Sequence, residues 1–234
     1  MTGSNPEAQR LNAIAAAIGC RNYLEIGVAT GDTFAVVEAP RKTGVDPAFQ
    51  FDISAASTAN VDFFTGTSDE FFAQLDSSVS YDLVYIDGLH TFAQTYRDFC
   101  NVLTHTHDRS VIVLDDVWPT DIFSVIPDYH RAMAERFRTG VPGMDWHGDV
   151  FKIASAIHDY HTTLSYATAL GEARPAMLVW RAPRRDSPRF RGLEEIERQT
   201  YLDFLDRLDL LNAIPQADAI RLSAAPARAA GSAR

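Results

Sequence analysis

The 234-residue sequence has only two cysteines, Cys20 and Cys100, and no C-x-x-C pair. Two isolated cysteines cannot form a disulfide framework, and without a C-x-x-C pair we expect neither a zinc ribbon nor a dithiol redox site. Long hydrophobic runs are also missing, because no apolar stretch approaches the roughly 20 residues that cross a bilayer. Residues 1–10 are polar and lack the basic-then-apolar order of a signal peptide. These absences predict a cytoplasmic protein with no membrane partner.

Basic residues are scarce relative to acidic ones, since 21 Lys and Arg against 31 Asp and Glu give a formal net charge of -10. The acidic excess belongs to residues 1–173, which carry 10 basic and 23 acidic side chains, whereas residues 174–234 carry 11 and 8. An acidic protein has no electrostatic attraction for nucleic acid, so we expect no nucleic-acid partner.

Short apolar segments alternate with segments of helical periodicity over most of the chain. Helices are predicted over 6–18, 92–103 and 151–160, among others. Strands are predicted at 23–26, 42–46, 61–64, 82–87, 110–114, 163–169 and 176–181, the last two forming an antiparallel C-terminal hairpin. Short strands that alternate with helices indicate βαβ units. The predicted fold class is therefore α/β, a doubly wound and mostly parallel sheet covered on both faces.

The domain prediction assigns residues 1–182 to one main domain. Residues 117–150 are rich in Trp, Pro, Gly, Asp and His, and this break in the alternation predicts a lid above the sheet. Residues 183–221 are predicted to be a linker and a helix, with an amphipathic helix over 192–214. This helix packs either on its own sheet or on another subunit, which would make a homo-oligomer. The Ala-, Ser- and Arg-rich end, 222–234, is expected to be disordered.

Polar residues follow each of the first five predicted strands, and ligands of open parallel sheets bind beyond the carboxyl ends of the strands. The first strand runs into the turn Glu25-x-Gly27-x-x-x-Gly31. Its two glycines allow close approach of a ligand, and the pattern is not the G-x-G-x-x-G of a dinucleotide site. Asp46 at the second strand end is placed to accept two ribose hydroxyls. A plain tight turn capped by Asp46 is the alternative, but the ordered pair favours a nucleoside ligand.

The glycine turn, the acid at the second strand end and the terminal hairpin together resemble class I S-adenosylmethionine-dependent methyltransferases over residues 8–182. The resemblance implies a Rossmann-like sheet of seven strands. It also implies S-adenosylmethionine as the cofactor, with its methionine part beside the first turn, its ribose at the second strand end and its adenine near the third. The residues thereby assigned to the cofactor are Glu25, Gly27, Gly31, Thr33, Asp46, Thr67, Ser68 and Asp87.

A second group of acids follows the fourth and fifth strands. Asp87 and, three residues later, His90 come after the fourth strand, and Asp115 and Asp116 come after the fifth. Three carboxylates at one edge repel each other unless a cation neutralises them, and oxygen ligands select Mg²⁺ or another hard divalent cation. We therefore predict a metal site at Asp87, Asp115 and Asp116. In the alternative without metal, Asp116 caps a helix and Asp87 binds cofactor alone.

These acids and His90 resemble the metal-dependent O-methyltransferases, distantly the catechol type and more closely the family that methylates sugars of macrolide-like natural products. We predict His90 and Asp87 as the catalytic residues, because imidazole accepts a proton near neutral pH and a metal acidifies a bound hydroxyl. The alternative for His90 is a helix-cap or packing role.

The predicted activity is Mg-dependent methyl transfer to a hydroxyl of a small molecule, such as a sugar or phenol of a natural product. Aromatic and sulfur side chains of the lid are candidates to line the acceptor pocket, namely Trp118, Tyr129, Met144 and Trp146. A metal-independent methyltransferase and a non-catalytic binding protein of the same fold stay open as alternatives.

Overall fold

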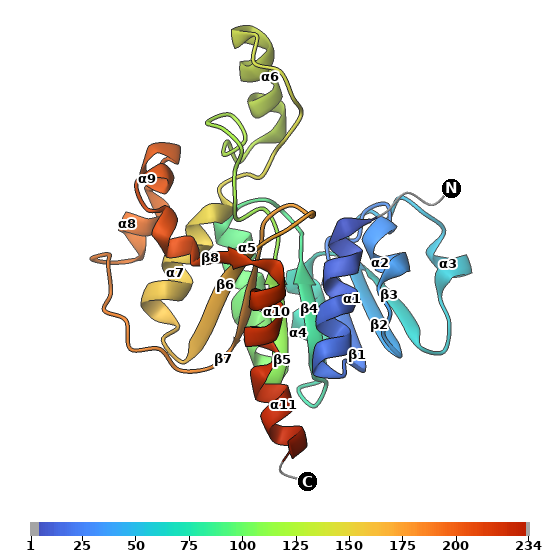
Figure 1. Ribbon diagram of the computed structural model, residues 1–234. Helices are drawn as coiled ribbons and strands as arrows, with labels where there is room; N and C mark the ends of the chain where they lie inside the picture. The colour runs from blue at the N-terminus through green and yellow to red at the C-terminus, as the bar shows by residue number, and fades with distance from the viewer. Residues whose placement is uncertain (1–4, 233–234) are drawn as a thin grey trace.

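The computed structural model of the chain describes residues 5–232, and Figure 1 shows one twisted sheet with helices on both of its faces. The strands are β1 (Asn22–Ile26), β2 (Arg41–Asp46), β3 (Val61–Thr65), β4 (Tyr81–Ile86), β5 (Thr106–Leu114), β6 (Leu164–Leu170), β7 (Ala176–Arg181) and β8 (Ala213–Pro215). The helices are α1 (Pro6–Ile18), α2 (Asp32–Val36), α3 (Ile53–Ala56), α4 (Ser68–Gln74), α5 (Phe92–Thr104), α6 (Tyr129–Thr139), α7 (Ile153–Tyr160), α8 (Leu193–Glu197), α9 (Tyr201–Leu205), α10 (Gln216–Ser223) and α11 (Ala225–Ser232), with 3-10 turns η1 (Val150–Lys152) and η2 (Leu208–Leu211).

The predicted α/β fold class is confirmed, with one strand more than the seven expected. The order is β3-β2-β1-β4-β5-β7-β6-β8. β1 to β5 pair in parallel, β7 is antiparallel to both β5 and β6, and the three-residue β8 extends the edge beside β6. Three residues of an otherwise irregular segment carry no periodic signal, so this strand escaped prediction.

The register of the central strands fixes which residues meet at the carboxyl edge of the sheet. Ile26 lies opposite Val45 of β2 and Ile86 of β4, and Ile86 in turn lies opposite Leu114 of β5. The polar residues that directly follow these strands are therefore side by side. This alignment places both predicted groups, the glycine turn and the acids, on one edge.

Both faces of the sheet are covered by apolar side chains, because alternate strand residues point to opposite sides. Leu24 and Ile26 pack in the layer with α5 and α7, while Tyr23 packs in the layer with α1 and α10. Val111 and Leu114 of β5 are fully buried. Each such side chain contributes roughly 1.5–3 kcal/mol to folding. A sheet buried on both faces leaves its carboxyl edge as the place for a ligand.

The C-terminal segment differs from the predicted single helix over 192–214. The chain forms α8, then α9, because Thr200 caps a new helix with Asp203 in a capping box. The tail predicted to be disordered from residue 222 is helical through α10 and α11 up to Ser232, and its last residues, 233–234, lie outside the described part. Ala219 of α10 is fully buried in the sheet layer, which explains the order of this segment.

The segment predicted as a lid leaves the sheet after β5 and carries α6, which projects away from the body of the molecule (Figure 1). Arg136 on α6 is buried and holds the base of this projection. Its guanidinium donates to Asp121 and to the carbonyl oxygens of Pro142 and Asp145. Within residues 5–232, no helix has the length and apolar character needed to cross a membrane.

Candidate active site

The turn after β1 is the first part of the site, and its backbone leaves no room for larger residues. Gly27 has a φ of 89°, and a Cβ there would lie 1.9 Å from the carbonyl oxygen of Asp87. Asp46 fixes the other side of the turn, because its carboxylate accepts hydrogen bonds from the N–H groups of Ala29 (2.8 Å) and Ala48 (2.7 Å). The glycine turn and Asp46 are therefore joined by hydrogen bonds, as one structural unit.

A cavity of about 540 Å³ opens beside this turn. Six of the predicted site residues line it: Gly27, Asp46, Thr67, Ser68, Asp87 and His90. Thr67 caps α4 in a capping box with Glu70, and Ser68, the first residue of the helix, lies at the cavity wall. The volume suits a cofactor-sized ligand, since such sites usually measure about 300–1,000 Å³.

Three residues assigned to the cofactor lie outside the cavity lining. Glu25 is buried beneath the turn and accepts a 2.5 Å hydrogen bond from the Tyr23 hydroxyl. Gly31 packs against the ring of Phe51. The Thr33 hydroxyl accepts a hydrogen bond from the Asn5 side chain at 3.4 Å. Of the glycine turn, Gly27 and Ala29 border the cavity.

Burial raises the pKa of Glu25 to about 8, against the opposing effect of the Tyr23 hydrogen bond. In the unfolded chain this carboxyl ionises near its ordinary pKa of 4.5, so between about pH 4.5 and 8 unfolding releases a proton. Stability then falls as the pH rises through that window. Glu25→Gln removes the titrating group and is expected to be more stable than wild type at pH 8 by on the order of 2 kcal/mol.

The measurement for Glu25→Gln is urea unfolding of both proteins at pH 5 and pH 8. The stability difference between variant and wild type is expected to grow by on the order of 2 kcal/mol from the lower to the higher pH. A difference that is equal at the two pH values would show that Glu25 is ionised in the folded protein.

His90 lies between two carboxylates at the far side of the cavity. Its Nε2 is 3.0 Å from Asp116 Oδ2 and 3.4 Å from Asp87 Oδ1. Among residues 5–232, Asp87, His90 and Asp116 are the one group of three potential metal ligands whose ligand atoms all lie within 4.8 Å of one another.

Asp116 shows the features expected of a cation ligand. It is 3% exposed and adopts a left-handed backbone with a φ of 58°. Its Oδ2 lies 3.0 Å from His90 Nε2, and its Oδ1 has only the more distant Arg174 (3.8 Å) and His147 (3.9 Å) near it. A buried carboxylate needs positive charge close by, and a strained backbone at a non-glycine residue persists only where its surroundings hold it. The carboxylates of Asp87 and Asp116 therefore fit a divalent cation.

The two acids change the protonation of His90. Burial lowers its pKa, but the hydrogen bonds with Asp116 and Asp87 outweigh burial and raise the pKa to about 10. Burial and the nearby Asp115 raise the pKa of Asp87. The pKa of His90 therefore lies above the ordinary imidazole value assumed in the sequence analysis, because the two carboxylates favour its protonated form.

Asp115, predicted as a third metal ligand, faces away from this group. Its Oδ2 accepts a 2.6 Å hydrogen bond from the Tyr85 hydroxyl and lies 3.2 Å from Arg174 Nη2, while its Oδ1 accepts the backbone N–H of Asp116. Burial raises the pKa of Asp115, and the Asp116 carboxylate adds to this effect. The structure brings His90, rather than Asp115, together with the other two acids.

A segment of the lid, residues 146–149, holds His90 in place; we call it the strap. The His90 Nδ1 lies 3.2 Å from the carbonyl oxygen of Trp146, and the two rings stack with centroids 4.5 Å apart. Gly148 crosses so closely that a Cβ there would lie 1.6 Å from the His90 carbonyl oxygen. Asp149 accepts the backbone N–H of Phe92 at 2.6 Å, at the start of α5. The strap thus fixes both the ring and the backbone of His90.

The predicted acceptor-lining residues divide into two sets. Tyr129 packs edge-on against Trp146, next to His90. Trp118 instead packs against Phe204 of α9, and Met144 is 70% exposed on the lid. Only the first pair lies near the catalytic candidates.

Sequence reasoning missed two residues at the site. Arg174 lines the cavity from the turn between β6 and β7, and the Nε2 of the buried His147 is 3.9 Å from Asp116 Oδ1. The position of Arg174 had a detectable signal, because a turn that follows β6 must lie at the same edge as the ends of the parallel strands. His147 had none, since the lid has no periodic pattern.

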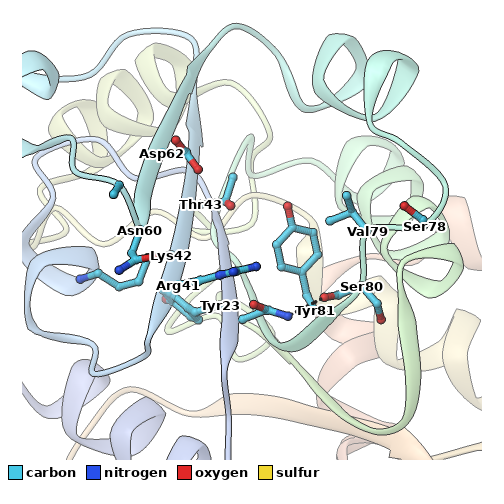
Figure 2. Close-up of a pocket in the computed structure, with 12 residues that line it drawn as sticks. Tyr23, Arg41, Lys42, Thr43, Asn60, Asp62, Ser78, Val79, Ser80 and Tyr81 are labelled. Atoms are coloured by element: carbon cyan, nitrogen blue, oxygen red, sulfur yellow. Dashed lines mark hydrogen bonds between the residues drawn. The ribbon is translucent and has the colours of Figure 1, made fainter.

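A second cavity, of about 430 Å³, lies at the opposite edge of the sheet, where β1, β2 and β4 begin (Figure 2). Polar side chains such as Arg41 and Tyr81 border it, but none of the predicted site residues does. His107 also lies toward this edge, 3.0 Å from Asp82. The predicted site residues that border either cavity all border the one at the carboxyl edge.

Comparisons with known proteins agree with the site's location. Residues 24–117 match the model of a methyltransferase domain, whereas no curated protein matches the sequence significantly. Among solved structures, cofactor-bound Rv0187 from MTB is 17% identical, with 77% of this chain and 82% of that chain covered and a TM-score of 0.56. An O-methyltransferase from Bacillus cereus in complex with SAH is 16% identical, with 76% and 82% covered and a TM-score of 0.50.

The solved structures establish a shared fold, and residues 24–117 match the model of a methyltransferase domain. Both findings agree with the class I S-adenosylmethionine-dependent methyltransferase predicted from the sequence. The matched segment begins in β1 and ends just past Asp116. It thus contains both the glycine turn and the acids of the second group.

Proposed function

We propose that the chain transfers the methyl group of S-adenosylmethionine to a hydroxyl of a small molecule. The observation that carries this proposal is the 540 Å³ cavity, which is lined by Gly27 and Asp46 and also by Asp87 and His90. The same cavity can therefore hold a nucleoside cofactor next to His90, the proposed proton acceptor. The cofactor- and SAH-bound neighbours of the same fold support this choice of cofactor.

Asp46 is proposed to hold the cofactor ribose. Each of its oxygens accepts one backbone hydrogen bond, and a carboxylate oxygen has two lone pairs, so one acceptor position per oxygen stays available. Thr67 and Ser68 border the same cavity and would lie toward the adenine. The backbone of the Gly27 turn would then contact the methionine part.

Asp87 and Asp116 are proposed to hold Mg²⁺ or another hard divalent cation, as the convergence of their carboxylates beside His90 suggests. Such a cation supplies Lewis-acid chemistry, lowering the pKa of a coordinated hydroxyl. With a cation on the two carboxylates, His90 would be a neutral imidazole. Its Nδ1 hydrogen would be donated to the Trp146 carbonyl oxygen, and its Nε2 would be the atom that accepts the hydroxyl proton.

The acceptor class is proposed to be a sugar or phenol, as expected from the sequence. Trp146 and Tyr129 place aromatic surface next to His90, which suits a ring-shaped acceptor. A metal-independent transferase is the second candidate. One observation favours it, namely that the protonated His90 and the Arg174 guanidinium already balance part of the acidic charge.

Transfer from methyl-labelled S-adenosylmethionine to a panel of catechols and simple glycosides tests this function, with Mg²⁺ or with a chelator. Labelled product that requires both Mg²⁺ and His90 is expected, with His90→Gln lowering turnover by on the order of 10²–10⁴-fold. Product formation that a chelator does not affect would favour the metal-independent transferase. A protein that fails to bind the cofactor at all would overturn both candidates.

A further inference from the structure

Arg174 lies among the acids of the site, although it was not predicted from the sequence as a site residue. Its Nη2 lies 3.2 Å from Asp115 Oδ2 and its Nη1 lies 3.8 Å from Asp116 Oδ1. The side chain is 54% exposed and borders the cavity, so it is open to solvent on one side and to the acids on the other. Arg174 therefore sits beside one proposed metal ligand while it binds the neighbouring acid.

The turn that carries Arg174 is anchored by buried groups. The guanidinium of Arg10, only 2% exposed, donates to the carbonyl oxygen of Arg174 and to the side chain of Gln216 at 2.8 Å. These contacts tie the turn to α1 and α10. The approach of Arg174 to the acids is consequently set by packed elements and not by a free loop.

Asp115 is held in the same way from several sides. Tyr85, Arg174 and the backbone N–H of Asp116 together occupy its two oxygens. Asp116, one residue later, has His90 Nε2 at 3.0 Å from its Oδ2, while Arg174 Nη1 is 3.8 Å from its Oδ1. The two adjacent aspartates thus differ because the tyrosine hydroxyl, the backbone N–H and the closer Arg174 nitrogen all go to Asp115.

We propose that Arg174 is a built-in counter-cation that keeps Asp115 out of the cation site and weakens the binding of a divalent cation by Asp87 and Asp116. This inference rests on the metal site of the proposed function. A positive charge a few ångströms from a divalent cation weakens its binding by on the order of tenfold. Arg174 is therefore a residue that tunes metal affinity, not a ligand.

The test measures Mn²⁺ binding by electron paramagnetic resonance and calorimetry in the full-length chain. Arg174→Gln removes the charge and is expected to bind Mn²⁺ about tenfold more tightly than wild type. Arg174→Lys keeps the charge and is expected to stay within about twofold of wild type. Arg221→Gln, which removes an exposed charge on α10, controls for the loss of positive charge elsewhere.

Asp115→Asn separates the two parts of the proposal. In the wild-type background it is expected to weaken Mn²⁺ binding by no more than about tenfold, because it removes a nearby negative charge and not a ligand. In the Arg174→Gln background it is expected to remove part of the gain, because the released Asp115 carboxylate adds negative charge to the site. Circular dichroism confirms folding, and Arg174→Met, which keeps the apolar stem, replaces Arg174→Gln if that variant does not fold.

Two results would overturn the proposal while leaving the metal site intact: equal Mn²⁺ affinity in wild type and Arg174→Gln, or a large loss of affinity in Asp115→Asn alone. Equal gains in Arg174→Gln and Arg174→Lys would assign the effect to packing and also overturn it. If neither wild type nor Arg174→Gln binds Mn²⁺, the metal site itself is wrong. A separate titration with S-adenosylhomocysteine then shows whether the transferase proposal survives.

Discussion

Gly27→Ala is expected to abolish S-adenosylhomocysteine binding and to lower the free energy of unfolding by about 3 kcal/mol or more. The new Cβ would lie 1.9 Å from the carbonyl oxygen of Asp87, at the point where β1 and β4 end side by side. Neither backbone can yield without moving the cavity wall. The φ of 89° adds a second penalty, because L side chains disfavour that region.

Gly19→Ala is the matched control for Gly27→Ala. Gly19 also has a positive φ, 66°, at the end of α1, but a Cβ there would meet no atom within 4 Å. It is therefore expected to cost only about 1 kcal/mol and to leave cofactor binding unchanged. Urea unfolding and calorimetry measure both effects. A Gly27→Ala protein that bound S-adenosylhomocysteine with wild-type affinity would contradict the assigned role of this turn.

Gly148→Ala is expected to displace His90 and to cost about 3 kcal/mol of stability. Its Cβ would fall 1.6 Å from the His90 carbonyl oxygen, and its φ is 56°. Because the strap also holds the His90 ring through Trp146, relief of this clash must separate the strap from the ring. Loss of the stack should appear as a change in Trp fluorescence.

Gly140→Ala controls for the positive φ of Gly148, since Gly140 has a φ of 69° at the end of α6 and open space around it. Only the Gly148 variant is expected to change the fluorescence of Trp146 and to lose Mn²⁺ affinity. Equal behaviour of the two variants would mean that the strap does not position His90.

The sheet was predictable because its strands carry a strong local signal. Val111 to Leu114 and Leu83 to Ile86 are apolar on both faces, as buried parallel strands require. The C-terminal segment was predicted less well, although the Thr200–Asp203 capping box is visible in the sequence and marks a new helix start. The apolar periodicity continues through this cap, and it therefore wrongly suggested a single helix over 192–214. Order in the tail depends on Ala219 packing against the sheet, which no local pattern reveals.

The site was predictable where strand ends determine it and unpredictable where distant segments meet. The ends of β1, β2 and β4 place Gly27, Asp46 and Asp87 together. Asp115 and Asp116 lie just past the end of β5, where the left-handed backbone of Asp116 separates their carboxylates, and the sequence does not predict this backbone conformation. The contacts of Arg174 and Trp146 join segments more than 50 residues apart, and such contacts cannot be predicted from a single sequence.

Calorimetric titration with S-adenosylhomocysteine tests the central claim most directly, namely that the cavity at the carboxyl edge is a nucleoside-cofactor site. We expect saturable binding of one equivalent by wild type, loss of binding in Asp46→Ala, and unchanged binding in Asp62→Ala, a variant at the cavity on the opposite edge. Absence of binding by the folded wild-type protein, or equal binding by both variants, would contradict the claim.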